Sequence, residues 1–432
     1  MKIVYLAAGA GAMYCGSCLH GNTLAAALCA AGQDCLLAPL YTPIHTDEKN
    51  VGIDRVALGG VNVYLQQRWS LFRHTPWAFD RLLDWPRLLR WVAGRSAGVR
   101  PEHLGPLTVS MLEGEHGRQR KEVEKLVHWL ERDVRPDIVH LNNTLLIGVA
   151  RQITRRLGVP VVCDLSGEDS FLEKLPEPHR SRALDVLRQR IGEAAALVAM
   201  NGYYAAFMAE YLRVPPSQIR VVPPGLNLAG HGTRTPSPGP LTIGYVARVC
   251  PDKGLHQLAA ALAILAADAN LPPVQVWAAG YLDAADRPYF TKIRRQIVEA
   301  GLGDRFHYVG PLDRAAKIAF LQSLDLFCLP TVYRESKGLS VFEAWANAVP
   351  AVLPAHGAFP EMVADTGGGV LCEPNDPAAL AAALKRMLWD IPFAAECGRR
   401  AQQAVHERYN AKMMARKMIE VYEGVGARNQ RL

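Results

Sequence analysis

Residues 326–344 read LFCLPTVYRESKGLSVFEA. The stretch begins with a short apolar run, Leu326–Leu329, continues through a loop that contains Glu335 and Gly338, and takes a helical pattern near Ser340. A short apolar run bounded by turn residues predicts a buried strand, and a helix after it is typical of a parallel sheet. The stretch therefore predicts one strand–loop–helix unit of an α/β fold.

The same alternation of apolar runs and helical patterns extends along the chain. The other runs are Ile3–Ala7, Cys35–Ala38, Ile138–Leu141, Val159–Cys163, Ala196–Met200, Thr242–Val246, Val274–Ala278, Phe306–Val309, Ala351–Leu353 and Gly369–Cys372. The loop 231–240, rich in proline and glycine, separates the two series. We expect two doubly wound α/β domains, residues 1–230 and 241–405, and a C-terminal helix within 406–432 that packs back on the first domain.

Length and composition exclude several classes of protein. The chain has 432 residues, which favours two or three domains, and 50% hydrophobic residues exclude a disordered chain. A net charge of +7 is too weak to indicate nucleic-acid binding. The nine cysteines are mostly isolated, as in a reduced cytoplasmic protein, and no run of 18 apolar residues predicts a transmembrane helix.

Much of the positive charge falls in one segment, Gln66–Arg100. It holds seven arginines and two aspartates, a charge of +5, together with four of the eight tryptophans. A basic, aromatic-rich surface fits a phospholipid headgroup or a lipid-linked molecule, which would make the protein peripheral at the membrane. The alternative is an ordinary packed helix pair with exposed arginines.

A glycine-rich loop follows the first predicted strand. Gly9, Gly11 and Gly16 lie in this loop, immediately before a helical pattern. Backbone N–H groups at a helix N-terminus can bind a phosphate, although a tight turn without a ligand has the same pattern. Cys15 and Cys18 in the same loop allow a redox or metal role, but one such pair cannot complete a four-ligand zinc site.

Two cations lie at a second strand–helix junction. A strand ends near Arg248 and a helix begins near Lys253, five residues later. A guanidinium and an ammonium at this spacing can converge on one diphosphate. The alternative is two solvated surface cations.

The loop between residues 330 and 344 carries the strongest indication of a ligand. Gly338 lets a ligand approach the backbone, and the N–H groups of Leu339, Ser340 and Val341 are expected to point out of a helix end toward a phosphate. The carboxylates of Glu335 and Glu343 can accept hydrogen bonds from sugar hydroxyls. For Glu343 the alternative is a capping box with Ser340.

In this order, Arg248-x4-Lys253 followed by Glu335-x7-Glu343 resembles the retaining glycosyltransferases of the GT-B fold, sequence family 4. The resemblance extends to residues 137–140, 221–227 and 357–361. It implies two Rossmann-like domains that face a cleft. The N-terminal domain would bind the acceptor and the C-terminal domain the nucleotide sugar.

The resemblance also implies roles for the donor-side residues. Arg248 and Lys253 would hold the donor diphosphate and neutralise the leaving group. Glu335 would bind hydroxyls of the donor sugar, with the backbone at 338–340 near the sugar and the phosphate. Glu343 would hold the ribose.

Other implied contacts come from elsewhere in the chain. Gly11 or Gly16 would close on the diphosphate, and the base would stack near Tyr308. Family members often carry H-x-H at the strand end where this chain has His140-Leu141-Asn142. Asn142 therefore stands in place of a histidine near the donor sugar, and His140 is either a substrate contact or a core residue.

The implied activity is transfer of a hexose from a nucleotide-diphosphate sugar to an acceptor hydroxyl with retained configuration. No paired carboxylate motif for a metal is evident, so we expect metal-independent transfer without a further cofactor. The sequence does not identify the acceptor, and a lipid-linked molecule is one candidate.

Three alternatives belong to other classes: an NAD(P)-dependent oxidoreductase, a nucleotide-sugar epimerase, and a thiol redox enzyme that uses Cys15 and Cys18. The oxidoreductase would need an acidic residue at the end of the second strand, and residues 36–39 contain none.

Overall fold

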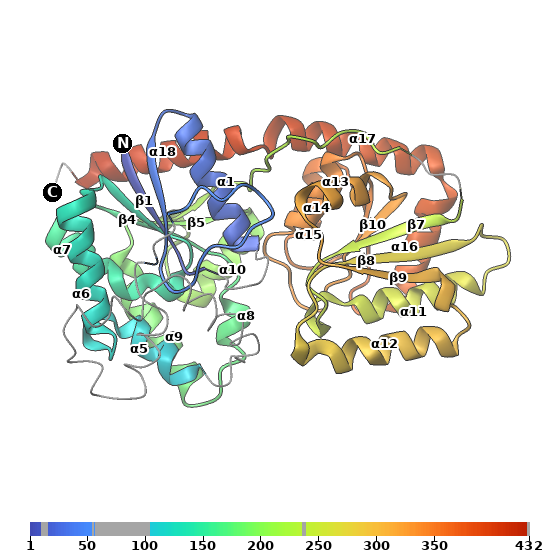
Figure 1. The fold of residues 1–432 in the computed structure, drawn as a ribbon, viewed down its shortest axis with the longest axis horizontal. Coiled ribbons are helices and arrows are strands. Elements are labelled where there is room, and N and C mark those ends of the chain that lie inside the picture. The colour runs from blue at the N-terminus through green and yellow to red at the C-terminus, as the bar shows by residue number, and fades with distance from the viewer. Residues whose placement is uncertain (10–15, 54–55, 57–103, 236–238, 430–432) are drawn as a thin grey trace. The chain divides into compact units, whose positions relative to one another are not determined.

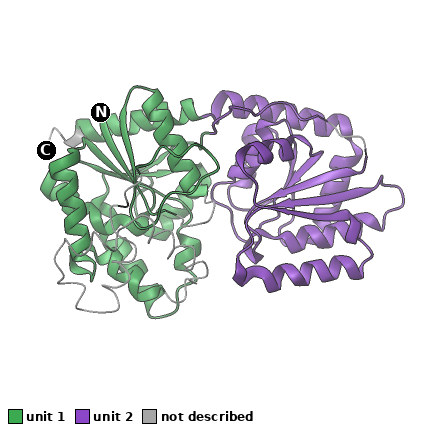
Figure 2. Cartoon of the chain, in the orientation of Figure 1, with its two compact units in different colours: residues 1–225, 411–432 green, residues 226–410 purple. Residues whose placement is uncertain are grey.

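The computed structural model describes residues 1–9, 16–53, 56, 104–235 and 239–429. The chain divides into two compact units, which Figures 1 and 2 show: unit 1 comprises residues 1–225 with 411–432, and unit 2 comprises residues 226–410. Each unit contains one parallel six-stranded sheet with helices around it. The predicted pair of doubly wound α/β domains is confirmed.

The sheet of unit 1 has the strand order β2-β1-β3-β4-β5-β6. Its strands are β1 (Lys2–Ala7), β2 (Asp34–Pro39), β3 (Ile138–Leu141), β4 (Val161–Asp164), β5 (Ala196–Ala199) and β6 (Ile219–Val221). Its helices are α1 (Gly16–Ala30), α5 (Gly105–Glu113), α6 (Arg120–Trp129), α7 (Ala150–Leu157), α8 (Asp169–Leu172), α9 (His179–Arg190), α10 (Gly202–Leu212) and α18 (Ala411–Asn429).

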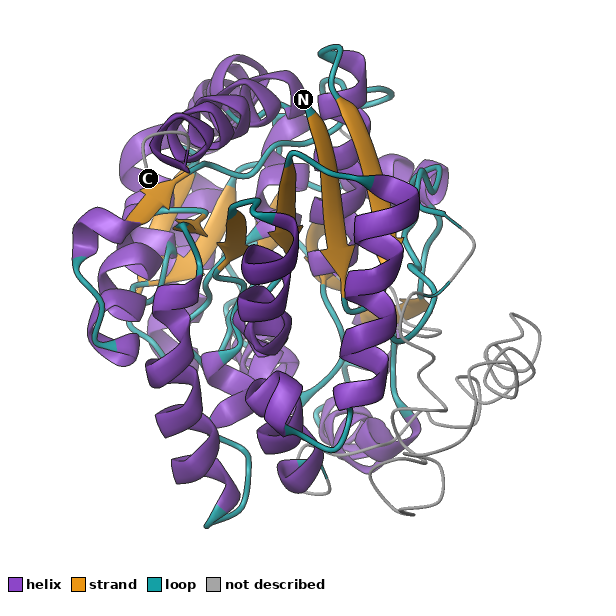
Figure 3. Cartoon of the chain, turned by 90° about the vertical axis from the view of Figure 1, so that its left-hand side faces the viewer, coloured by secondary structure: helices purple, strands orange, loops and turns teal. Residues whose placement is uncertain are grey.

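Helices cover both faces of this sheet, as Figure 3 shows. Alternate residues of a strand point to opposite faces, so Val4 and Leu6 of β1 join one core and Ile3 and Tyr5 join the other. The first core includes side chains of α5, α6, α7, α9 and α10. The second core includes α1 and α18, which pack against each other. The last helix of the chain therefore completes the core of the first unit.

The sheet of unit 2 has the order β12-β11-β10-β7-β8-β9. Its strands are β7 (Leu241–Val246), β8 (Val274–Ala279), β9 (Phe306–Gly310), β10 (Leu326–Cys328), β11 (Ala351–Pro354) and β12 (Gly369–Cys372). Its helices are α11 (Leu255–Ala266), α12 (Arg287–Glu299), α13 (Arg314–Gln322), α14 (Leu339–Ala346), α15 (Phe359–Thr366), α16 (Pro377–Trp389) and α17 (Ile391–Arg408). None of the described helices, in either unit, is both long and apolar enough to span a membrane.

The boundary between the units differs from the loop expected at 231–240. The division falls at Gly225, and the segment after it belongs to unit 2. Arg234 shows why: its N–H donates to the carbonyl oxygen of Asn347 at 2.8 Å, and its guanidinium pairs with Asp325 at 2.8 Å. Proline and glycine content predicted an irregular segment here, but these polar contacts attach residues 231–235 to unit 2.

Candidate functional site

The candidate site lies at the carboxyl end of the unit 2 sheet. Strands β7 and β10 are neighbours there, and the chain leaves them for opposite sides of the sheet order. In parallel α/β sheets such a reversal of strand order opens a crevice where ligands bind. The loop after β7 carries Arg248 and Lys253, and the loop after β10 carries Glu335 and Gly338. The fold thus brings together the two motifs that the sequence places about 80 residues apart.

Two backbone contacts hold these loops against each other. The N–H of Val332 donates to the carbonyl oxygen of Asp252 at 2.9 Å. Gly254 has φ +72°, and a Cβ atom there would lie 1.7 Å from the carbonyl oxygen of Pro330. Only glycine permits this approach, so Gly254 fixes the distance between the two loops.

The centre of the site is a triangle of polar side chains. Lys253 Nζ donates to Glu335 Oε2 at 2.7 Å and to the hydroxyl of Tyr333 at 2.6 Å. The Tyr333 hydroxyl donates to the same Glu335 oxygen at 2.7 Å. The backbone N–H groups of Ser336 and Lys337 donate to Glu335 Oε1 at 3.2 and 3.1 Å. The Glu335 side chain is 7% exposed and the Lys253 side chain 21%, so Lys253 is the more accessible of the two to a ligand.

The triangle fixes the charges of its members. Burial acts to raise the pKa of Glu335, but the Lys253 ammonium, the Tyr333 hydroxyl and the backbone N–H of Lys337 lower it to about 2. Burial acts to lower the pKa of Lys253, yet Glu335 and Tyr333 raise it above its ordinary value. Burial and the neighbouring Glu335 raise the pKa of Tyr333. The site therefore holds a carboxylate, an ammonium and a neutral phenol at neutral pH.

Arg248 follows β7 and is exposed. In the part of the chain that the structure describes, no carboxylate forms a salt bridge with it. The hydroxyl of Tyr245 donates to the carbonyl oxygen of Arg248 at 3.2 Å and so attaches the Arg248 backbone to the end of the strand. Burial acts to lower the pKa of Arg248, but Cys250, Asp286 and Asp252 raise it above its ordinary value. Arg248 thus presents a charged guanidinium at the same end of the sheet as the Lys253 ammonium.

Helix α14 begins immediately after Gly338. This glycine is the N-cap, with φ +64°, and a Cβ atom there would lie 2.6 Å from Cε of Met362. The N–H groups of Leu339 and Ser340 belong to the first turn, where a helix has no acceptor of its own. The N–H of Val341 does not match the prediction, because it donates to the carbonyl oxygen of Gly338 at 3.0 Å.

Glu343 lies one turn further along α14, but its carboxylate forms an ion pair with Lys317 of α13. Both residues are buried. The capping box with Ser340 is absent, because Gly338 takes the N-cap position and no side chain caps the helix. Any contact of Glu343 with the ribose is therefore made by a carboxylate whose position the ion pair with Lys317 fixes.

Tyr308 is the middle residue of β9, an edge strand, with β8 between β9 and β7. Its hydroxyl donates to the carbonyl oxygen of Gly280 at 2.8 Å, and its ring centroid lies 4.7 Å from that of Phe290. Burial raises the pKa of the hydroxyl. These contacts fix the ring with its hydroxyl at the carboxyl end of β8, and its role at the base stays a prediction.

His140 of unit 1 is a core residue, which corrects the substrate contact considered for it. Its side chain has no exposed surface; Nδ1 lies 2.6 Å from the Tyr422 hydroxyl and Nε2 lies 2.9 Å from Asp164 Oδ1. Tyr5 also donates to Asp164, at 2.7 Å. Although burial acts to raise it, His140, His20 and Tyr5 hold the pKa of Asp164 below its ordinary value. This network joins three strands to α18 and offers no group to a substrate.

Asn142 is also buried, at 3% exposure. Its Oδ1 accepts from the backbone N–H of Ala8 at 3.2 Å and from Asn143 at 3.1 Å. Asn142 thus holds the start of the loop that follows β1. Gly16 is the exposed first residue of α1, whereas Gly11 lies outside the described residues.

The cysteine pair lies partly, and the tryptophan-rich segment wholly, outside the described residues. Cys18 is buried, and Cys15 lies outside the described residues, as does Gln66–Arg100. Among the described residues, no group of three or more His, Cys, Asp and Glu side chains is arranged to hold a metal ion.

Sequence reasoning missed a second group of polar residues at the ends of β3 and β4. Glu168 accepts from the Thr144 hydroxyl at 2.6 Å and from the N–H of Ser166 at 2.6 Å. Tyr204 donates to Asp169 at 2.6 Å. Burial raises the pKa values of Glu168 and Asp169. Sequence reasoning also missed Tyr333 and Lys317. For Tyr333, the sequence did offer an indication, because its hydroxyl lies only two residues before Glu335.

Two family descriptions match the chain: Glycosyltransferase Family 4 over residues 89–229, and Glycosyl transferases group 1 over residues 234–404. The chain belongs to the group 1, family 4 glycosyltransferases. The resemblance stated from the motifs is confirmed, and this glycosyltransferase transfers a sugar from a nucleotide-sugar donor. Family membership therefore favours sugar transfer over the oxidoreductase, epimerase and thiol redox alternatives.

Individual relatives agree with this assignment. The glycosyltransferase is 27% identical to glycogen synthase of Mycobacterium tuberculosis over 296 residues, which cover 68% of this chain and 70% of the relative. It is 28% identical to D-inositol 3-phosphate glycosyltransferase of Salinispora tropica over 324 residues, 68% of this chain and 66% of the relative.

Two solved structures share the GT-B fold. Sucrose-phosphate synthase from Thermosynechococcus elongatus matches with a TM-score of 0.73 at 20% identity, over 99% of this chain and all of the other. Anabaena HepE in complex with UDP-glucose matches with a TM-score of 0.65 at 17% identity, over 98% of this chain and all of the other. At these identities the matches establish the fold alone.

Proposed function

We propose that unit 2 binds a nucleoside diphosphate hexose through Arg248, Lys253 and Glu335, and that the hexose passes to an acceptor hydroxyl with retained configuration and without a metal ion. The Lys253–Tyr333–Glu335 triangle beside Arg248, at the carboxyl ends of β7 and β10, carries the proposal. Charge accumulates on the departing diphosphate, so two cations there stabilise the transition state.

The triangle suggests how donor binding proceeds. Four donors contact the Glu335 carboxylate: Lys253, Tyr333 and the N–H groups of Ser336 and Lys337. A carboxylate has about four acceptor positions, so a sugar hydroxyl must replace one of these donors. The incoming diphosphate attracts the ammonium of the partly exposed Lys253 side chain, which frees Glu335 Oε2 for the sugar. In this scheme Lys253 exchanges Glu335 for the diphosphate, and Glu335 exchanges Lys253 for a hydroxyl of the hexose.

The other contacts have supporting roles in this proposal. The first-turn N–H groups of Leu339 and Ser340 face the phosphate, and Glu343, held by Lys317, accepts from the ribose. Tyr308 supports the base. Gly16 lies at the start of α1, where a phosphate could also bind. We assign the acceptor to unit 1, where the half-buried Asp169 lies near the ends of β3 and β4.

Turnover of UDP-glucose is the first test, because the Anabaena neighbour was solved with this molecule. Released nucleoside diphosphate is measured by mass spectrometry with the wild type, Arg248→Ala, Lys253→Ala and the control Arg294→Ala. Arg294 is an exposed cation of α12, away from the strand ends of the site.

We expect kcat/KM to fall about 100-fold or more in the two site variants and to stay unchanged in the control. Unchanged turnover in Arg248→Ala and Lys253→Ala would overturn the assignment of the site. In a thermal-shift assay, UDP should stabilise the wild type and NAD should not.

A further inference from the structure

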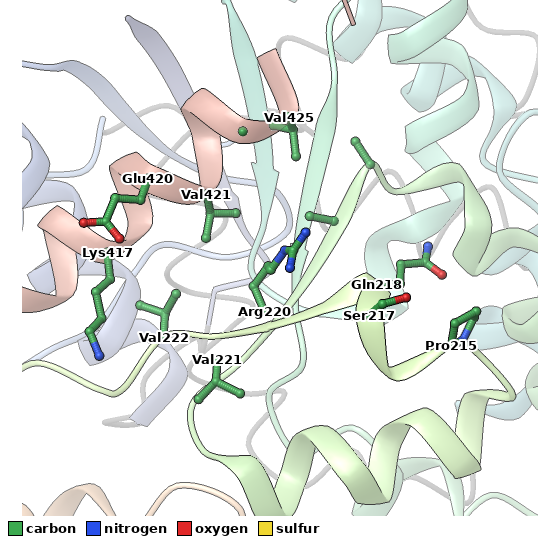
Figure 4. A pocket seen from close by; sticks show the side chains of 13 residues that line it. Pro215, Ser217, Gln218, Arg220, Val221, Val222, Lys417, Glu420, Val421 and Val425 are labelled. Carbon is green, nitrogen blue, oxygen red and sulfur yellow. The ribbon is translucent and has the colours of Figure 1, made fainter. Parts of the chain in front are cut away.

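A groove in unit 1 has no role in the donor site. It lies between α18 and the edge strand β6, as Figure 4 shows, and has a volume of about 590 Å³. One wall is the residue 417–425 part of α18, the other is the turn at 215–218, and the floor is the start of β5 together with β6. Small-molecule sites commonly have volumes of about 300–1,000 Å³.

The geometry of β6 directs the side chain of Arg220 into this groove. Val222 belongs to the core that contains α18, whereas Ile219 belongs to the core on the other face of the sheet. Alternate residues of a strand share a face, so Arg220 projects on the α18 side. In Figure 4 the Arg220 side chain extends from β6 toward α18, and Lys417 extends from the helix at another position along the groove.

The positive charge of the groove is not neutralised within the part of unit 1 that the structure describes. No described carboxylate pairs with Arg220 or Lys417, and both side chains are exposed. Glu420 lines the same groove, but it forms an ion pair with Arg416, with Glu420 Oε1 3.6 Å from Arg416 Nε. A guanidinium without a carboxylate is a suitable partner for a phosphate or a carboxylate group of a ligand.

Apolar side chains lie beside this cation. Val222 and Val425 are buried at the back of the groove, and Val421 of α18 is half-buried. We propose that the groove binds an organic phosphate, with the phosphate at Arg220 and an apolar portion against Val421 and Val425. A phospholipid and a soluble phosphate ester share this chemistry, so the test separates these two sources.

The position of one glycine provides a variant that fills the groove without disturbing the fold. Gly424 lines the groove on α18, and a Cβ atom there would meet nothing within 4 Å. Gly426, two residues later on the same helix, is equally open but does not line the groove. Leucine favours a helix more than glycine does, so Gly424→Leu and Gly426→Leu should both fold.

The probe is hexyl phosphate, and its binding to the full-length protein is measured by titration calorimetry. We expect saturable binding to the wild type and to Gly426→Leu, at least tenfold weaker binding to Arg220→Ala, and none to Gly424→Leu. Lys412→Ala, which removes an exposed cation of α18 outside the groove, should bind as the wild type does. Inorganic phosphate should bind more weakly than hexyl phosphate because it lacks the apolar portion.

Three results would overturn the proposal: no saturable binding to the wild type, equal binding to Gly424→Leu and Gly426→Leu, or loss of binding in Arg248→Ala in place of Arg220→Ala. The last would place the phosphate in the donor site. Co-sedimentation with vesicles of phosphatidic acid and phosphatidylcholine then separates the sources. Sedimentation that depends on Arg220 indicates a lipid ligand, and its absence together with hexyl phosphate binding indicates a soluble ester.

Discussion

Replacing Lys253 by methionine should destabilise unit 2 by about 3 kcal/mol at neutral pH. The substitution retains an apolar side chain of similar length but leaves the buried Glu335 carboxylate without its ammonium. A pKa lowered from 4.5 to about 2 corresponds to about 3 kcal/mol of stability. This stability is fully present above pH 4.5 and is lost as the pH falls through about 2. Breaking a buried ion pair from one side costs a similar amount, about 3–5 kcal/mol.

The variant should also change the pH dependence at this position. Without Lys253, burial still acts to raise the pKa of Glu335 and only the Tyr333 hydroxyl and the backbone N–H groups oppose it, so the pKa should rise from its wild-type value of about 2. Protonation then relieves the unpaired charge, so the deficit of Lys253→Met against the wild type should shrink between pH 7 and pH 4. The double variant Lys253→Met/Glu335→Gln contains no unpaired charge and should be more stable than Lys253→Met at pH 7.

Urea unfolding followed by tryptophan fluorescence measures these differences, and hydrogen exchange with mass spectrometry assigns the affected transition to unit 2. Two units can unfold separately, so this assignment is needed. Arg294→Met, which removes an exposed cation, is the control. The reasoning is refuted if Lys253→Met is as stable as Arg294→Met at pH 7, or if its deficit is the same at pH 4.

Three further substitutions test individual contacts. Tyr333→Phe removes the hydroxyl that joins the ammonium and the carboxylate and should lower kcat/KM for the donor about tenfold, whereas an unchanged value would remove that hydroxyl from the site. Gly338→Ala should lower stability and raise the donor KM more than Gly301→Ala; both glycines have positive φ, but only the first would meet a side chain. Lys317→Met should cost about 3 kcal/mol in urea unfolding and Lys317→Met/Glu343→Leu less, and equal losses would contradict a buried ion pair.

The strands could be predicted because buried parallel strands are continuous apolar runs with clear ends. Ile138–Leu141 and Gly369–Cys372 match β3 and β12 residue for residue. Strand β6 was missed, because its three residues include the exposed Arg220 and Val221 and lie between prolines. Only pairing with β5 makes this segment a strand, and pairing is not visible in local sequence.

The site could be predicted as a set of residue types in order, but not as a set of contacts. Loop chemistry indicated Lys253 and Glu335, and the strand order brings them within 2.7 Å. Nothing local indicates that Lys317 pairs with Glu343, because the two residues lie on different helices. His140 was ambiguous for the same reason: its partners Asp164 and Tyr422 are distant in sequence.

The placement of α18 has a consequence for how this protein is made. Unit 2 is encoded by one uninterrupted stretch, residues 226–410, whereas unit 1 needs residues 411–429 to cover one face of its sheet. Domains usually fold in the order in which the ribosome produces them. Here the first unit to be translated is the last to be completed, and until Met414, Met418 and Tyr422 emerge its apolar surface remains uncovered. A nascent chain stalled before residue 411 should therefore recruit chaperones through unit 1 and not through unit 2.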